Sequence, residues 1–219
     1  MTKLNVYVVR HGQTYYNIYN KLQGWSNSPL TDKGIQDAQA AGQKLAETTF
    51  AAAYCSDTTR AEQTAKMILA ANHAGAPETP IVVPYFREEF YGYFEGTNMD
   101  EAWYMAGAPH GLATFKQIVE KYSIGKAKDF LKAADPFHDA EDNAEYWQRL
   151  DQGFALIRSN DQLKDGDNVL LISHGNTVLS MMEKFGQGKY DLTVRPQNGS
   201  VTKLIVTADD VTVDYYNRK

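Results

Sequence analysis

Short runs of apolar, β-branched and aromatic residues recur along the chain and are bounded by turn residues. Runs of this length and composition predict buried strands. The first expected strands cover Leu4–Val9, Phe50–Cys55 and Ile81–Phe86, and a fourth covers Val169–Ile172. Two further runs, Val201–Val206 and Val211–Tyr215, are separated by Ala208-Asp209-Asp210 and predict a C-terminal β-hairpin.

Helical patterns lie between these runs. Thr31 is a predicted helix N-cap with Asp32 in the first turn, and this helix should continue to about Thr48. Further helices are expected over Thr58–Asn72 (capped by Ser56 or Asp57), Asp142–Ser159 and Thr177–Lys184. This alternation predicts an α/β fold, a three-layer α/β/α sandwich with a mostly parallel sheet.

Residues 97–143 interrupt the alternation. They contain glycines, aromatic residues and short helical patterns, but no convincing strand. We therefore expect residues 1–219 to form a single domain, in which 97–143 is a helical, cap-like insertion that covers the active-site end of the sheet.

Composition narrows the function. The 219 residues carry a net charge of -5, which argues against a nucleic-acid partner because phosphate backbones favour basic surfaces. The run Leu4–Val9 is too short for a signal-peptide core or a membrane span, which favours a cytoplasmic protein with no membrane partner. Cys55, the single cysteine, lies in an apolar stretch and is expected to be a buried structural side chain.

Two histidine segments carry the candidate chemistry. Arg10-His11-Gly12 and Ser173-His174-Gly175 each follow a predicted strand directly. Ligands of open α/β sheets bind at the carboxyl ends of the strands, where both segments would lie. A neutral imidazole is a competent nucleophile, arginines such as Arg10 and Arg60 clamp phosphate oxygens, and a protonated carboxyl at Glu88 or Glu89 can act as a general acid. The pattern favours phosphoryl chemistry.

Five blocks in this order resemble the histidine phosphatase superfamily, also called phosphoglycerate mutase-like. The blocks are Arg10-His11-Gly12-Gln13-Thr14 with Asn17; Gln23-Gly24-Trp25 with Pro29-Leu30-Thr31 and Gly34; Ser56-Asp57-Thr58-Thr59-Arg60-Ala61 with Thr64-Ala65; Arg87-Glu88 with Gly92 and Glu95-Gly96; and Ser173-His174-Gly175. They span residues 4 to about 178.

The resemblance implies roles for these residues. His11 would be the nucleophile that becomes phosphohistidine, and Glu88 the proton donor. Arg10, Arg60 and His174 would hold the phosphoryl group without a metal or other cofactor. The substrate-binding residues would be Asn17, Gln23, Gly24, Tyr91 and Gly175. Three separate histidines, His73, His110 and His138, are expected at or near the surface and do not predict a metal site.

The family includes phosphatases and mutases, and we prefer a phosphatase that acts on a small phosphorylated metabolite. Cofactor-dependent phosphoglycerate mutases carry a lysine where this chain has Met99, followed by an arginine pair, whereas here no arginine occurs between Arg87 and Arg149. A mutase remains the alternative, because lysines of the insertion could replace those cations: Lys116, Lys121, Lys126 and Lys128. A catalytically inactive phosphate-binding protein is the remote alternative.

Two further questions stay open at this level. The aromatic residues around Glu88 could line a substrate pocket or pack between the sheet and the insertion, with Tyr91 expected to face the site; they are Tyr85, Phe86, Phe90, Tyr91, Tyr93 and Phe94. The sequence also leaves open whether the protein forms a homodimer.

Overall fold

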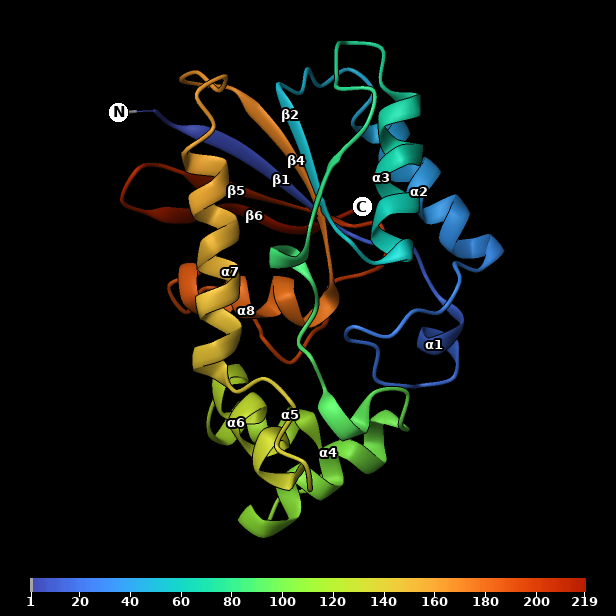
Figure 1. Ribbon diagram of the computed structural model, residues 1–219, viewed down its shortest axis with the longest axis vertical. Helices are drawn as coiled ribbons and strands as arrows, with labels where there is room; N and C mark the ends of the chain where they lie inside the picture. The colour runs from blue at the N-terminus through green and yellow to red at the C-terminus, as the bar shows by residue number, and fades with distance from the viewer. Residues whose placement is uncertain (1) are drawn as a thin grey trace.

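A single six-stranded sheet organises the computed structural model, which describes residues 2–219 (Figure 1). Its strands are β1 (Leu4–Arg10), β2 (Ala52–Ser56), β3 (Ile81–Val83), β4 (Asn168–Ser173), β5 (Val201–Val206) and β6 (Val211–Arg218). They lie in the order β3-β2-β4-β1-β5-β6. The first four strands in sequence run parallel, while β5 and β6 form an antiparallel hairpin beside β1. The mostly parallel sheet and the terminal hairpin are confirmed.

Helices cover both faces of the sheet. The helices α2 (Asp32–Lys44) and α3 (Thr59–Ala71) lie on one side, and α7 (Asn143–Arg158) and α8 (Gly175–Phe185) on the other (Figure 1). Successive residues of β4 alternate between the two layers: Val169 and Leu171 pack with α7 and α8, whereas Leu170 and Ile172 pack with α2 and α3. A strand buried on both faces explains why β4 is an unbroken apolar run, and it confirms the three-layer architecture.

Residues 97–143 are helical, as their pattern indicates. They contain α4 (Met99–Gly107), α5 (Phe115–Lys121) and α6 (Ile124–Ala134), grouped at the lower end of the molecule in Figure 1. Trp103, Ile118 and Leu131 form an apolar cluster with Leu22 and Phe94, two residues from outside the insertion. This shared cluster attaches the helices to the segments around the site. The remaining helical pieces are α1 (Tyr15–Ile18) and three 3-10 turns at Pro84–Phe86, Gly92–Phe94 and Ala108–His110.

Several element boundaries differ from the sequence prediction. The third strand ends at Val83 instead of Phe86, because Pro84 lacks the N–H that a strand ladder needs and begins a 3-10 turn. The first long helix ends at Lys44 instead of near Thr48. The helix α8 begins at Gly175, two residues earlier than predicted, so His174 becomes its N-cap residue.

The predicted cap of α3 was also wrong. Thr58, rather than Ser56 or Asp57, occupies the N-cap position, and its side chain makes no capping hydrogen bond. Ser56 instead ends β2, where its hydroxyl group lies within hydrogen-bond distance of Thr58 and of the His174 ring. A residue that a local pattern assigns to a helix cap therefore belongs to the candidate site.

Candidate active site

The two histidines predicted from the strand ends come together in the fold. β1 and β4 are adjacent parallel strands whose register pairs Arg10 with Ser173. His11 and His174 follow these paired residues, and their ring centroids lie 5.1 Å apart. Both side chains are buried. The pairing of two distant strands thus places two imidazoles at one edge of the sheet.

His11 is held in one tautomer. Its Nδ1 lies 2.7 Å from the carbonyl oxygen of Gly12, which can only accept, so Nδ1 carries the proton. Burial and the neighbouring Arg60 and Arg10 guanidinium groups hold the pKa of His11 well below its usual range. The ring is therefore neutral, and its Nε2 keeps a lone pair that can attack an electrophile.

His174 is engaged at both ring nitrogens. Nη2 of Arg60 lies 3.1 Å from its Nδ1 and must donate, so Nε2 carries the proton and donates to the hydroxyl oxygen of Ser56 at 2.7 Å. Burial and the nearby Arg60 lower the pKa of His174 well below its usual range. His174 therefore orients Arg60 here, and direct contact with a phosphoryl oxygen would require its Nδ1 to exchange Arg60 for the ligand.

Arg60 is fully buried and points toward the loop that contains residues 23–26. Its Nη2 donates to the carbonyl oxygens of Gln23 and Gly24, and its Nη1 donates to that of Ser26. Burial lowers the pKa of Arg60 to about 10, so it stays charged at neutral pH. Its buried Nε has no hydrogen-bond partner in the structure, which leaves one donor available to an anion.

Glu95 fixes this loop from its other side. Its carboxylate accepts hydrogen bonds from the backbone N–H groups of Gly24, Trp25, Ser26 and Tyr91, and from the Ser26 hydroxyl. Because the amides of the loop point toward Glu95, its carbonyls can point toward Arg60. The N–H of Gly24, which the resemblance assigned to substrate binding, is therefore already occupied in the structure.

Arg10 lies at the N-terminal end of α8. Its Nη1 donates to the carbonyl oxygen of Pro196, and its buried Nε has no partner. Burial lowers the pKa of Arg10 to about 10, which leaves it charged at neutral pH. A Cβ added to Gly175 would lie only 3.2 Å from Cζ of Arg10, so the glycine lets the guanidinium approach the helix.

Amide side chains complete this part of the site. Asn17 forms a capping box with Thr14, and its Oδ1 accepts from Nδ2 of Asn198. The same Nδ2 donates to the carbonyl oxygen of His11 and so holds the backbone at this residue. Gln23 accepts from the Thr14 hydroxyl, while its own buried Nε2 has no partner. Buried N–H groups without partners on Gln23, Arg10 and Arg60 fit a site that receives an anion.

Glu88 also lines the site and is held by α8. Its Oε2 accepts from the backbone N–H of Asn176 at 2.8 Å, and its Oε1 accepts from the hydroxyl of Thr177 at 2.9 Å. Neighbouring Glu89 is buried but does not line the pocket, and burial raises the pKa of Glu89 well above its usual range. Of the two candidate acids, the structure thus places Glu88 at the site.

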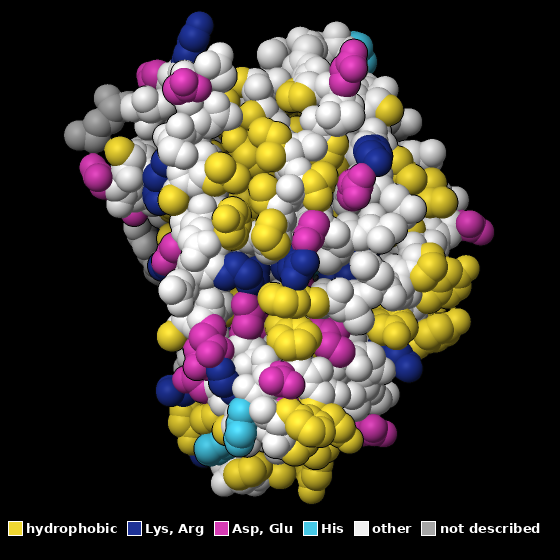
Figure 2. Space-filling model, viewed as in Figure 1, with side chains coloured by type: hydrophobic (Ala, Val, Ile, Leu, Met, Phe, Trp, Pro, Cys, Tyr) yellow, Lys and Arg dark blue, Asp and Glu magenta, His cyan; other side chains and the backbone are white. Residues whose placement is uncertain are grey.

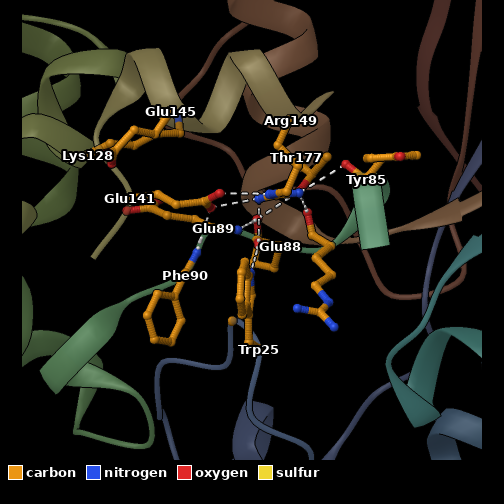
Figure 3. A network of polar contacts seen from close by, with 12 residues as sticks. Trp25, Tyr85, Glu88, Glu89, Phe90, Lys128, Glu141, Glu145, Arg149 and Thr177 are labelled. Atoms are coloured by element: carbon orange, nitrogen blue, oxygen red, sulfur yellow. Dashed lines mark hydrogen bonds and ion pairs between the residues drawn. The ribbon is translucent and has the colours of Figure 1, made fainter. Parts of the chain in front are cut away.

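Arg149, on α7, fixes the segment that carries Glu88. It donates to the carbonyl oxygens of Tyr85, Arg87 and Glu88 and forms a two-pronged ion pair with Glu141 (Figure 3). The indole N–H of Trp25 also donates to the carbonyl oxygen of Glu88 (Figure 3). This network was missed at the sequence level, because carbonyl acceptors leave no signature in the residue types.

These groups surround a narrow pocket with a volume of about 30 Å³. The predicted residues on its wall are Arg10, His11, Asn17, Gln23, Glu88, Tyr91 and Gly175, whereas Arg60 and His174 are not among the residues that line it. Four further lining residues were not predicted as site residues: Lys21, Met99, Asn176 and Arg195. Asn176 directly follows the Ser173-His174-Gly175 block and could have been found from it. No motif marked Lys21 or Arg195.

The lysines of the insertion do not supply the cations of this pocket. Lys116 and Lys126 are exposed and pair with acidic residues of their own helices, and Lys121 is exposed near Tyr122. Lys128 is buried and donates to the hydroxyl of Ser180. Arg195 from the loop before β5 reaches Met99 instead, with its Nη1 2.9 Å from the sulfur.

The aromatic residues around Glu88 divide between the site and the packing. Tyr91 lines the pocket, and its hydroxyl accepts from Nδ2 of Asn176. Phe86 and Phe94 belong to the apolar clusters, Phe90 lies against Trp25, and Tyr93 is exposed. The structure therefore contains both roles that the sequence left open: Tyr91 lines the pocket, and other aromatic residues of this group belong to the packing.

Residues predicted to lie outside the site do so. Cys55 is buried in β2, and burial raises the pKa of its thiol to about 12, which makes it a poor nucleophile. His73 and His138 are exposed, and His110 is half-buried against Phe130. Acidic and basic side chains lie interspersed over the face shown in Figure 2.

Two kinds of feature are absent from residues 2–219. Across these residues, the structure contains no group of three or more His, Cys, Asp or Glu side chains arranged to hold a metal ion. Within the same range, no helix combines the length and the apolar character that crossing a bilayer requires.

Comparison with known proteins places this site in a family. A family model for the histidine phosphatase superfamily (branch 1) matches residues 6–219. The chain is 31% identical over 177 residues to 2,3-bisphosphoglycerate-dependent phosphoglycerate mutase 2 of Gloeobacter violaceus, which covers 80% of this chain and 72% of that protein. It is 36% identical to fructose-2,6-bisphosphatase TIGAR B of Danio rerio over 58% of this chain and 51% of that protein. A crystal structure of phosphoglycerate mutase from Bacillus anthracis superposes with a TM-score of 0.89 and 30% identity, over 99% of this chain and 94% of that one. The chain belongs to the histidine phosphatase superfamily.

Proposed function

We propose that this protein hydrolyses small phosphomonoesters through a phosphohistidine formed on His11. The observation that carries the proposal is the state of His11: a neutral ring whose Nδ1–H is bound to Gly12 and whose Nε2 lone pair is left for attack. Buried donors without partners on Arg10, Arg60 and Gln23 are suited to the phosphoryl oxygens.

In the first step, Nε2 of His11 attacks phosphorus and the ester P–O bond breaks. The leaving oxygen takes a proton from Glu88, because an alkoxide is a poor leaving group. Arg10 and Arg60 balance the charge of the transferring group, so the proposed reaction uses no metal ion.

In the second step, a water molecule replaces the departed alcohol. Glu88, now ionised, accepts a proton from this water molecule. At the same time the water oxygen attacks the phosphorus of phosphohistidine. The N–P bond breaks, inorganic phosphate forms, and His11 returns to its neutral state. Glu88 thus acts as acid and then as base.

A mutase is the second candidate. Relatives named as phosphoglycerate mutases support it. Lys21 and Arg195 support it as well, because they bring to the pocket cations of the kind that the insertion lacks. A mutase would return the phosphoryl group to a second oxygen of the bound acid instead of to water. We prefer hydrolysis as the function, as the missing lysine and arginine pair of the insertion favour it.

Transfer of radiolabelled phosphate tests the proposal. Wild-type protein should take up acid-labile, base-stable label from a phosphomonoester donor, and His11→Asn should take up none. His138→Asn is the matched control, because His138 is exposed and does not line the pocket. Absence of label in the wild type with every donor would support the inactive binding protein.

The fate of the label separates the two enzymes. Release as inorganic phosphate supports hydrolysis. Rapid interconversion of 2- and 3-phosphoglycerate in the presence of bisphosphoglycerate, with little free phosphate, would replace the phosphatase assignment by the mutase.

A further inference from the structure

Lys128 is a fully buried lysine that the proposed reaction does not use. It lies on α6 of the insertion, its Nζ donates to the hydroxyl oxygen of Ser180 at 2.8 Å, and this nitrogen lies 4.5 Å from the ring centroid of Tyr146. None of the ion pairs found within residues 2–219 includes it. A buried ammonium group without a carboxylate in contact is costly, so a lysine at this position points to a task that an apolar side chain could not perform.

Acidic side chains surround this ammonium group beyond contact distance. Burial lowers the pKa of Lys128, and the charges of Glu89, Glu183, Glu88 and Asp129 raise it, in decreasing order. Glu89 is itself buried, and its Oε1 has no hydrogen-bond partner. Burial raises the pKa of Glu89 well above its usual range, although the charge of Lys128 acts against this rise. The carboxyl of Glu89 is therefore protonated at neutral pH, and the charge of Lys128 acts on the remaining carboxylates.

Lys128 and Glu88 are both attached to α8. Ser180 follows Thr177 by three residues, so their hydroxyl groups lie on the same face of this helix. Thr177 donates to Oε1 of Glu88 at 2.9 Å, and Ser180 accepts from Lys128. Tyr146 lies beside both contacts, because its ring faces Lys128 and its buried hydroxyl group lies near those of Thr177 and Ser180. These three side chains are buried and uncharged at neutral pH, so they screen a charge much less than water does.

A second contact fixes α6 against α8. The carboxylate of Glu183 accepts hydrogen bonds from the backbone N–H groups of Ile124 at 2.6 Å and Gly125 at 3.0 Å, the first two residues of α6. Lys128 lies one turn further along α6, and Ser180 lies one turn before Glu183 on α8. Two polar contacts thus hold the insertion helix to the helix that binds Glu88, and they fix the place of the ammonium group relative to that carboxyl.

The other charges around Glu88 have partners of their own in the proposed reaction. The titratable groups that act on Glu88 or share its pocket, apart from Lys128, are Arg10, His11, Lys21, Arg60, Glu89, Tyr91, Tyr146, Arg149 and Arg195. A bound phosphoryl group offsets the cations beside it, and Glu141 offsets Arg149. Lys128 has no counter-charge in contact, so its charge remains to favour an ionised Glu88.

We propose that Lys128 is a positioning residue for the second step: its buried charge and its hydrogen bond to Ser180 keep Glu88 ionised and oriented while water attacks phosphohistidine. The inference rests on the proposed function, because Glu88 has a task only in that reaction. It gives the insertion a part in catalysis without contact with the substrate. Loss of the Lys128 charge should therefore slow the second step most at low pH, where Glu88 is most easily protonated.

Decay of labelled phosphohistidine measures the second step alone. Protein labelled on His11 by a radioactive phosphomonoester is separated from the donor, and release of inorganic phosphate is followed between about pH 5 and pH 8. Labelled protein denatured in urea gives the uncatalysed decay at each pH. The variants are Lys128→Met, Glu89→Gln, the double variant Lys128→Met/Glu89→Gln and the control Lys126→Met. Lys126 lies on the same helix, is exposed and pairs with Asp129.

The double variant keeps the test decisive where Lys128→Met alone does not fold. It removes both buried ionisable groups at once, so neither is left buried beside an apolar replacement of its partner. It also separates two routes of action. A lysine that serves only to offset Glu89 would have no effect once Glu89 is an amide, whereas a lysine that acts on Glu88 would still be missed.

We expect the decay rate of the wild type and of Lys126→Met to fall on the acidic side at the same pH. In Lys128→Met and in the double variant, this fall should lie about one pH unit higher, the low end of the effect of a nearby opposite charge. Glu89→Gln should leave the fall in place, since an amide resembles the protonated carboxyl.

Three results would overturn the inference. A fall at the wild-type pH in the double variant, or a loss of rate by the same factor at every pH, would show that Lys128 supports only the fold, and the proposed function would stand. An equal shift in Lys126→Met would assign the effect to net charge. If the wild type takes up no label from any donor, the proposed function fails, and the role of Lys128 fails with it.

Discussion

Arg149 offers the sharpest test of how the fold positions Glu88, the proposed general acid. Its guanidinium group makes five hydrogen bonds, of which three go to the carbonyl oxygens of Tyr85, Arg87 and Glu88 and two to the carboxylate of Glu141. The segment that carries Glu88 therefore has its backbone fixed from α7. Arg149→Lys keeps the charge but replaces a planar fork by a single nitrogen with three donors.

The expected loss of stability follows from the contacts. Arg149 and Glu141 are each only 12% exposed, so solvent screens their interaction weakly. Removing one partner of a buried pair costs about 3–5 kcal/mol, which we expect for Arg149→Met. A lysine at this position can keep a contact with Glu141, but its three donors leave at least two of the five hydrogen bonds unmade. At about 1 kcal/mol per hydrogen bond, Arg149→Lys should lower the free energy of unfolding by about 2 kcal/mol.

The effect on catalysis should depend on the leaving group. A shift of about 1 Å in a catalytic group can cost about 100-fold, so Arg149→Lys should lower kcat for an alkyl phosphate by about that factor. Nitrophenyl phosphate needs little protonation and should lose about ten-fold or less. Steady-state kinetics on both substrates and urea denaturation provide the two measurements.

Arg158→Lys is the matched control for Arg149→Lys. Arg158 is the last residue of the same helix and donates to the carbonyl oxygen of Thr207, away from the pocket. It should leave the ratio of the two rates unchanged. If Arg149→Lys lowers both rates by the same factor, Arg149 supports only the fold, and the argument that it positions Glu88 is wrong.

Three other predictions concern the loop and the histidines. Glu95→Gln should lower kcat/KM for all phosphomonoesters about ten-fold or more, because the loop that orients Arg60 loses a charged acceptor; unchanged kinetics would contradict this. Gly24→Ala should destabilise the protein by more than about 2 kcal/mol in thermal unfolding, since a Cβ would clash with the Glu89 carbonyl oxygen and the Glu95 carboxylate, and an unchanged Tm would refute the clash. His11 and His174 have lowered pKa values in the fold, so below about pH 6.5 the unfolded chain binds more protons than the folded one. The free energy of unfolding should therefore decrease as the pH falls, by up to about 2.7 kcal/mol per pH unit for two protons. Urea denaturation between pH 7 and 5 should show this slope reduced by about half in His11→Asn; a slope that does not change would show that folding does not lower the pKa of His11.

The meeting of His11 with His174 could be predicted from the sequence because it follows from strand pairing. Two apolar runs predict buried strands, and parallel strands end at the same edge of a sheet, so His11 and His174 had to lie near each other if β1 and β4 were neighbours. Arg60 and Glu88 needed the family resemblance as well. No periodicity determines where the N-terminus of α3, or the turn after β3, meets that edge.

Residues that act through backbone groups could not be predicted in this way. Glu95 belongs to one of the motif blocks, but the motif does not reveal its contacts. Its carboxylate accepts five hydrogen bonds, mostly from backbone amides of residues 24–26, and almost any residue type would provide such amides. Ser56 was assigned to a helix cap because serine is a good cap, yet its hydroxyl serves His174. The side chain of Ser56 thus makes the tertiary contact with His174 and not the local capping contact that its residue type favours.

Arg195 shows that a cation missing from one segment of the chain can be supplied to the pocket by another segment. The absence of arginines between Arg87 and Arg149 correctly described the insertion, but a pocket is assembled from several segments. A loop about 96 residues further along the chain places a guanidinium against Met99, the position that seemed to lack its cation. The charge at a site therefore has to be read from the positions of side chains in space, since the ligand responds only to where the charge lies. The identity of the substrate should accordingly be argued from the charges that surround the pocket, and these favour a more anionic molecule than the insertion alone indicated.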